Sequence, residues 1–149
     1  MEAVAYKQPV VLRWADLDPN GHVRHSVYYD FGAAVRVGFF TEHGLTIAAM
    51  QQLEIGPILF REEAVFRREI RWGEHLWMNL LVTRLRPDGS RFSFRHELLR
   101  DDGVLCAVIT VDGAWIDTQK RKLTTPPAIG RDMLVSAPKS TDFEWLSSP

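Results

Sequence analysis

VYYDFGAAVRVGFFTEH, residues 27–43, is the segment that decides the fold. Aromatic and branched side chains recur in it every three or four positions and so share one helical face: Tyr28, Phe31, Val35 and Phe39. Few charged residues interrupt the segment, whereas a helix on a protein surface presents a broad polar face. The pattern therefore predicts one long helix that is mostly buried.

Beyond residue 55 the chain is rich in strand-like runs separated by short turns. The runs read GPILFR, AVFRREIRW, LWMNLLVTRLR, RFSFRHELLR and VLCAVITVDGAWI. PDGS at 87–90 and DDG at 101–103 are typical of hairpin turns. In RFSFRHELLR apolar and polar side chains alternate, as expected for an antiparallel strand with one buried face.

The order of these elements predicts an α+β fold. A short strand-like run, PVVLRWA, precedes the helix, and the sheet would be antiparallel, with about five strands curled around the helix. We expect a single domain over residues 1–149 with its core at about 8–125. Residues 126–149 read as a poorly specified tail, in which FEWL at 143–146 is the part able to dock.

Composition excludes several classes of protein. With 149 residues, 46% of them hydrophobic, the chain can bury a core without disulfides or a structural metal. Its one cysteine, Cys106, lies in an apolar run, and we predict that its side chain is buried and packs in the core. A net charge of −1 gives no reason to expect nucleic acid as a partner. The absence of a signal-like N-terminus and of any membrane-length apolar run predicts a soluble, cytoplasmic protein with no membrane span.

ADLDPNGHVRHSVYYD, residues 15–30, leads into the helix and concentrates the polar chemistry. Its acidic residues resemble the start of a calcium-binding loop, but the required glutamate position holds Val27. The two histidines, His22 and His25, lack the spacing of a helical metal pair, so no metal site is expected. A solvated turn with Ser26 as helix cap is the plainest alternative.

The position of this stretch favours chemistry over a plain turn. Unpaired N–H groups and the helix dipole at a helix N-terminus favour developing negative charge. A carboxylate held there can attack a carbonyl, or direct water to attack it, while the N–H groups receive the carbonyl oxygen. A thioester suits this arrangement because its carbonyl is electrophilic and a thiolate leaves readily.

The run DPNGHVRHSVY, residues 18–28, resembles the D-x-x-G-x-V-x-x-x-x-Y stretch of hotdog-fold acyl-CoA thioesterases of the hydroxybenzoyl-CoA and YbgC type. The resemblance covers residues 8–125 and implies a hotdog fold. It assigns Asp18 as the catalytic carboxylate, either nucleophile or general base. It places His25 where a backbone N–H meets the thioester oxygen, and gives Asp16 and Tyr28 supporting roles.

The resemblance also implies the partners. The substrate would be an acyl-CoA, no separate cofactor would be needed, and the site would form between subunits of a homodimer or homotetramer. Basic residues on the third and fourth strands would hold the CoA nucleotide, and the matching positions are Arg84 and Arg91, with Arg95 and Lys120 behind them.

Two other functions stay open. A hotdog-fold hydratase or dehydratase would carry D-x-N-x-x-H, but position 23 is Val and His22 comes one residue early; the H-F-P-G signature of the dehydratases is missing too. A non-catalytic protein that binds acyl thioesters or a protein partner is the second alternative. The presence of both Asp18 and His25 argues against it.

Overall fold

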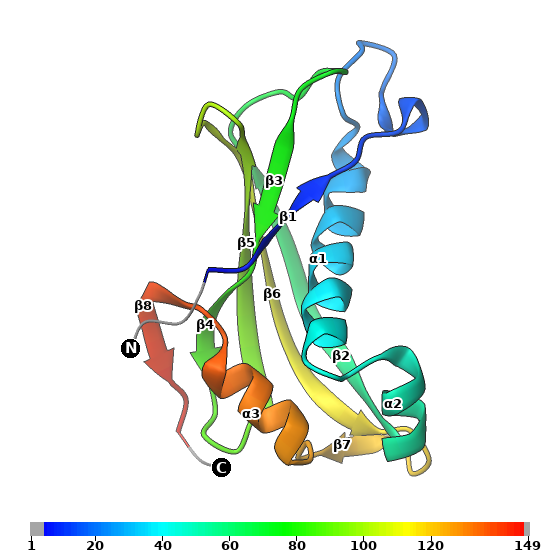
Figure 1. Cartoon of the computed structure of the whole chain (residues 1–149), viewed down its shortest axis with the longest axis vertical. Helices are drawn as coiled ribbons and strands as arrows, with labels where there is room; N and C mark the ends of the chain where they lie inside the picture. The colour runs from blue at the N-terminus through cyan, green and yellow to red at the C-terminus, as the bar shows by residue number, and fades with distance from the viewer. Residues whose placement is uncertain (1–4, 148–149) are drawn as a thin grey trace.

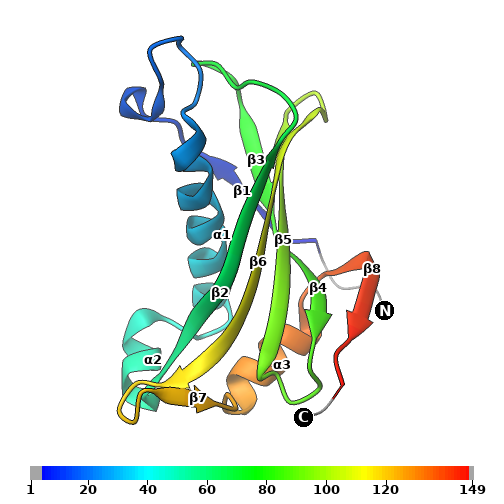
Figure 2. The same cartoon turned by 180° about the vertical axis from the view of Figure 1, so that it is seen from behind.

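The computed structural model describes residues 5–147 and folds them as one sheet wrapped around a helix (Figures 1 and 2). The helices are η1 (Trp14–Asp16), η2 (His25–Val27), α1 (Tyr28–Glu42), α2 (Ile47–Leu53) and α3 (Ala128–Ser136). The strands are β1 (Lys7–Val10), β2 (Ile55–Phe66), β3 (Leu76–Asn79), β4 (Leu81–Leu85), β5 (Arg91–Arg100), β6 (Leu105–Asp117), β7 (Lys122–Thr124) and β8 (Lys139–Trp145).

The central helix α1 is confirmed, although it is slightly shorter than expected. The chain enters it through the 3-10 turn η2, and neither N-cap residue makes a side-chain capping bond. Ser26, the helix cap in the plain-turn alternative, lies inside η2 instead. The face carrying Tyr28, Phe31, Val35 and Phe39 is buried as predicted. Burying each such side chain contributes about 1.5–3 kcal/mol, so this face anchors the helix to the sheet.

Within residues 5–147 the sheet has eight strands rather than about five. One reason is that the predicted run at 76–86 breaks at Leu80, giving β3 and β4, which both pair with β5. In the opposite sense, GPILFR and the first three residues of AVFRREIRW form one continuous strand, β2, which pairs with β6 apart from a register shift between Leu59 and Arg61. The rest of that predicted run, residues 67–72, lies outside β2. The turns at 87–90 and 101–103 connect strands as predicted, with Gly89 and Gly103 at positive φ.

The C-terminal segment differs most from expectation, because it is ordered rather than poorly specified. Residues 128–136 form α3, and β8 then adds to the sheet in parallel with β4. Glu144 and Trp145 lie opposite Arg84 and Leu85, so the predicted docking of FEWL is confirmed. Figure 1 shows α3 and β8 at the end of the sheet away from the loop that precedes α1.

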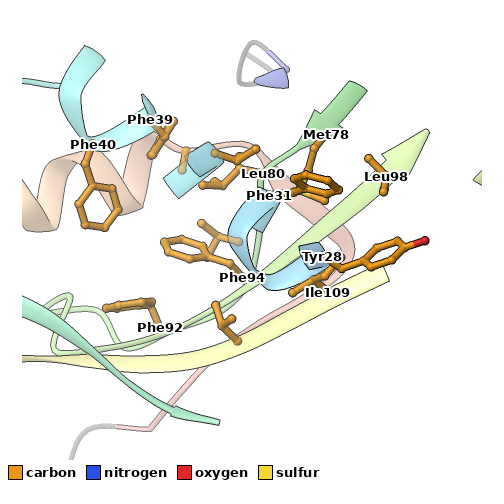
Figure 3. Close-up of a cluster of buried hydrophobic side chains, with 14 of the residues drawn as sticks. Tyr28, Phe31, Phe39, Phe40, Met78, Leu80, Phe92, Phe94, Leu98 and Ile109 are labelled. Atoms are coloured by element: carbon orange, nitrogen blue, oxygen red, sulfur yellow. The ribbon is translucent and has the colours of Figure 1, made fainter. Parts of the chain in front are cut away.

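The core lies between α1 and the concave face of the sheet, and several aromatic rings pack together within it (Figure 3). Phe92 and Phe94 from β5 contact each other with ring centroids 4.9 Å apart. Phe40 of α1 stacks on Trp115 of β6 at 5.8 Å. Cys106 is fully buried, as predicted, and burial raises the pKa of its thiol.

Candidate active site

The loop before α1 is closed on itself and tied to the loop after β2. Leu17 and Val23 form an isolated bridge, and the Val23 N–H donates to the Ile70 carbonyl at 2.8 Å. Gly21 sits at the tip with φ of 80°, a conformation that glycine adopts without strain. The two loops thus form facing walls at the N-terminal end of α1, at the top of Figure 1.

Between these walls lies a hollow of about 370 Å³, called the N-terminal hollow below. Its lining residues are Asp18, Asn20, His22, Val23, His25, Tyr28, Phe66, Arg67, Arg68 and Glu69. Three of the four predicted catalytic or supporting residues therefore reach one hollow. His22 also borders it, and its Nε2 lies 3.2 Å from Glu69.

Asp18 is half-buried, and backbone N–H groups of the residues that follow it hold its carboxylate in a fixed orientation. Oδ1 accepts hydrogen bonds from the backbone N–H groups of Asn20, at 2.8 Å, and His22, at 3.1 Å. Oδ2 accepts none from any residue within 5–147. One oxygen is thus anchored, and the other is available to a ligand in the hollow.

The first turn of the helix offers unpaired donors beside this carboxylate. Among the described residues, none accepts a hydrogen bond from the backbone N–H of His25 or of Ser26, whereas the Val27 N–H donates to the Arg24 carbonyl at 3.1 Å. The side chain of His25 is exposed at the rim of the hollow. Free N–H groups at the start of a helix favour an oxyanion.

Tyr28 forms the inner wall of the N-terminal hollow. Its ring is buried and packs edge-on against Phe66, with ring centroids 4.9 Å apart. Figure 3 shows its hydroxyl oxygen pointing away from the apolar cluster. Burial raises the pKa of the Tyr28 hydroxyl to about 12, which keeps it protonated and able to donate a hydrogen bond at neutral pH.

Asp16 lies beneath the site rather than in it. Its carboxylate is 2% exposed and accepts from the Arg13 backbone N–H at 2.9 Å and from Arg13 Nη2 at 2.8 Å. These hydrogen bonds, the one from the Arg13 guanidinium above all, lower the pKa of Asp16. The Asp16 carbonyl also accepts from the Arg24 N–H at 2.8 Å, so this residue braces the loop that carries Asp18.

The residues predicted to bind the CoA nucleotide lie outside the hollow of the same chain. Arg84 Nε lies 2.8 Å from Glu144, and Arg95 Nη2 lies 3.2 Å from Asp142, so both reach across to β8. Arg91 packs over the Phe60 ring at 4.6 Å, and Lys120 is exposed in the turn between β6 and β7. Their role in CoA binding stays a prediction.

Sequence reasoning missed two cations that do border the N-terminal hollow, Arg67 and Arg68. Both follow directly on β2, and both donate their backbone N–H to the Cys106 carbonyl, at 2.8 and 3.0 Å. The sequence signal was present, since this pair belongs to the arginine-rich stretch that begins at Arg61. What the sequence did not reveal is that β2 ends beside the loop of Asp18.

Within residues 5–147 no three His, Cys, Asp or Glu side chains are grouped as ligands of a metal ion would be. In the same range, no helix has both the length and the apolar character needed to cross a bilayer.

Comparison with known proteins defines the family. The sequence profile of the Thioesterase-like superfamily matches residues 12–137, and the chain belongs to this superfamily, whose hotdog fold it has. None of the curated protein sequences compared with the chain matches it.

Solved structures share the fold at low sequence identity. A hypothetical protein from Staphylococcus aureus in complex with CoA is 18% identical, with a TM-score of 0.86, covering 95% of this chain and 90% of that one. A Pseudomonas aeruginosa protein is 23% identical, with a TM-score of 0.81 and coverage of 93% and 94%. The 1,4-dihydroxy-2-naphthoyl-CoA thioesterase from Synechocystis is 16% identical, with a TM-score of 0.78 and coverage of 89% and 96%.

Proposed function

We propose that the protein is an acyl-CoA thioesterase that hydrolyses the thioester in the N-terminal hollow. The observation that carries this proposal is the pairing of two complementary groups at one hollow. Asp18 presents an unbonded carboxylate oxygen, and the start of the helix presents N–H groups that have no partner among residues 5–147. Membership of the Thioesterase-like superfamily supports the same activity.

Hydrolysis follows from these groups in a simple sequence. The thioester carbonyl lies between Asp18 and the His25 N–H, which stabilises the negative charge that develops on oxygen. Asp18 either takes a proton from attacking water or attacks the carbon itself to give a mixed anhydride that water then cleaves. The C–S bond breaks, and the products are the free acid and the CoA thiol. No metal or cofactor enters this scheme.

The surroundings of the hollow supply binding groups. The protonated Tyr28 hydroxyl can donate a hydrogen bond to substrate or water. Arg67 and Arg68 are the cations nearest the hollow, and guanidinium groups bind phosphate well. We include Arg84, Arg91, Arg95 and Lys120 as phosphate contacts that a neighbouring subunit would bring close.

A homodimer or homotetramer is part of the proposal. One edge of β2 pairs with β6 over its whole length, and the other edge pairs with no strand among residues 5–147. An open edge twelve residues long presents unpaired N–H and C=O groups, and a second strand satisfies them. The open edge of β2 is therefore the surface we assign to the partner subunit.

Activity on a panel of acyl-CoAs tests the proposal. Short, long and aromatic acyl-CoAs are incubated with the purified protein, and free thiol is followed with a thiol-reactive dye. Release of thiol that Asp18→Asn abolishes supports hydrolysis. Loss of the enoyl double bond without thiol release indicates a hydratase instead. Binding of acyl-CoA with neither reaction indicates a non-catalytic protein.

A further inference from the structure

A second hollow lies against the later turns of α1, between α1, α2 and the sheet, and is called the helix cavity below. Its volume is about 210 Å³. An apolar cavity of roughly 150 Å³ holds a benzene ring, so this one accommodates a ring with a small substituent. Its lining is apolar, apart from one charged and one hydroxyl-bearing side chain, and includes Phe40, Met50, Leu59, Phe92 and Phe94.

The charged group in this lining is Arg36, whose side chain is only 13% exposed. Its Nη1 lies 3.1 Å from His96 Nε2, and its Nη2 lies 3.5 Å from Glu62 Oε2. An arginine side chain carries several N–H donors and no acceptor, and these two contacts leave donors unused within the described chain. Because Arg36 is the charged residue of this lining, its remaining donors are available to an acceptor bound in the cavity.

The neighbours of Arg36 hold it in place and set its charge environment. His96 is fully buried, and its Nδ1 lies 2.9 Å from the Asn79 carbonyl, which directs Nε2 toward Arg36 as an acceptor. Burial, aided by the Arg36 charge, lowers the pKa of His96 to about 3 and keeps the ring neutral. Gly32 leaves the needed space, because a Cβ there would lie 3.2 Å from Arg36 Nη1.

Glu62 decides which acceptor fits. Its carboxylate already supplies one negative charge to the guanidinium, and the neutral His96 adds none. A second carboxylate in the cavity would be repelled by Glu62 and would lose its own hydration. A neutral oxygen that accepts a hydrogen bond is not repelled by Glu62 and loses much less hydration free energy than a carboxylate.

We propose that the helix cavity binds a compact apolar group, about the size of one ring, that carries a neutral oxygen acceptor, and that Arg36 donates a hydrogen bond to this oxygen. The inference goes beyond the hydrolysis proposed above, because it concerns a different hollow and is measured without turnover. Asp18→Asn keeps this binding, so the two proposals fail separately.

Three probes of similar shape test the proposal: acetophenone, isopropylbenzene and benzoate, which carry a neutral oxygen, no oxygen and a charged carboxylate. Binding to the full-length protein is measured by NMR, from the amide signals of α1 and α2 and the Arg36 Nε–H signal. We expect acetophenone to bind about tenfold more tightly than either other probe, since hydrogen bonds to charged groups are the stronger ones.

Two variants separate a binding role of Arg36 from a structural one. Arg36→Met removes the donors and should bring acetophenone and isopropylbenzene within about twofold of each other. Glu62→Gln changes a partly exposed side chain and should raise benzoate affinity about tenfold, because the guanidinium loses its counter-ion. Equal binding of acetophenone and isopropylbenzene by the wild type, or no response of the cavity signals to either, would overturn the proposal. If Arg36→Met does not fold, the wild-type and Glu62→Gln titrations still decide it.

Discussion

The two hollows beside α1 differ in how their polar groups are satisfied. In the N-terminal hollow, Asp18 is held through one oxygen, and the other oxygen and the first helical N–H groups have no partner in the described chain. At the helix cavity, Arg36 is the charged residue of an otherwise largely apolar lining, and its guanidinium contacts His96 and Glu62, which lie outside that lining. The first arrangement suits chemistry on a bound group, and the second suits recognition of a group by shape.

The same contrast appears between two carboxylates only two positions apart. Asp16 is buried and bound by Arg13, whereas Asp18 is half-buried and borders a hollow. Both are aspartates in one loop, so residue type does not explain their different surroundings. What separates them is which oxygens already have donors.

The largest expected effect comes from Asp18→Asn. Asparagine keeps an Oδ1 for the Asn20 and His22 N–H groups, so the loop is preserved while the charge is lost. We expect kcat/KM for acyl-CoA to fall on the order of 100-fold or more, as for loss of a catalytic carboxylate. Asp30→Asn, an exposed carboxylate in the first turn of α1, is the matched control. Activity of Asp18→Asn within threefold of the wild type would contradict the assignment of chemistry to this hollow.

The buried polar cluster predicts a dependence of stability on pH. The pKa of His96 is lowered from 6.5 to about 3 in the folded protein. Between pH 6.5 and about pH 3, His96 is therefore protonated in the unfolded chain but neutral in the folded one. Stability is therefore complete above pH 6.5 and falls as the pH drops, by about 1.4 kcal/mol per unit, or roughly 2 kcal/mol by pH 5.

His96→Gln isolates this effect in urea unfolding at several pH values. Glutamine has no such protonation, so the free-energy difference between wild type and variant should shrink by about 2 kcal/mol from pH 7 to pH 5. A difference that stays constant over this range would mean that the folded protein accepts a charged His96.

Tyr28→Phe should have a smaller effect, confined to the N-terminal hollow. Phenylalanine keeps the packing against Phe66 and loses only the hydroxyl. We expect kcat/KM to fall about three- to tenfold, the usual value of one hydrogen bond. Thermal unfolding should be nearly unchanged, and a large loss of stability would show that the hydroxyl serves the fold instead.

The smallest expected effects concern the CoA phosphates. Arg67→Gln with Arg68→Gln, and separately Arg84→Gln with Arg95→Gln, should each raise KM for acyl-CoA about two- to fivefold with little change in kcat, as for exposed ion pairs. Acyl-pantetheine, which lacks the nucleotide, is the control substrate and should respond to neither pair. If the variants of one pair leave the KM for acyl-CoA unchanged, the arginines of that pair do not contact the nucleotide.

Local sequence determined the elements whose signals are short-range. The three- to four-residue period predicted α1 and its buried face, and alternation predicted β5. The Asp-Pro-Asn-Gly run predicted a turn before the helix, with its carboxylate near the helix start. These features depend on residues that are neighbours in the chain, so their pattern can be recognised in the sequence before the tertiary structure is known.

Tertiary structure alone decided the features that join distant segments. It set β8 beside β4, brought Arg67 and Arg68 to the loop of Asp18, and placed His96 against Arg36 on α1. It also assigned Asp16 to the interior and Asp18 to a hollow, since only the packed loops determine which carboxylate oxygens find donors. Such contacts arise when the core closes, and the free energy that selects them comes from surface buried by the whole chain.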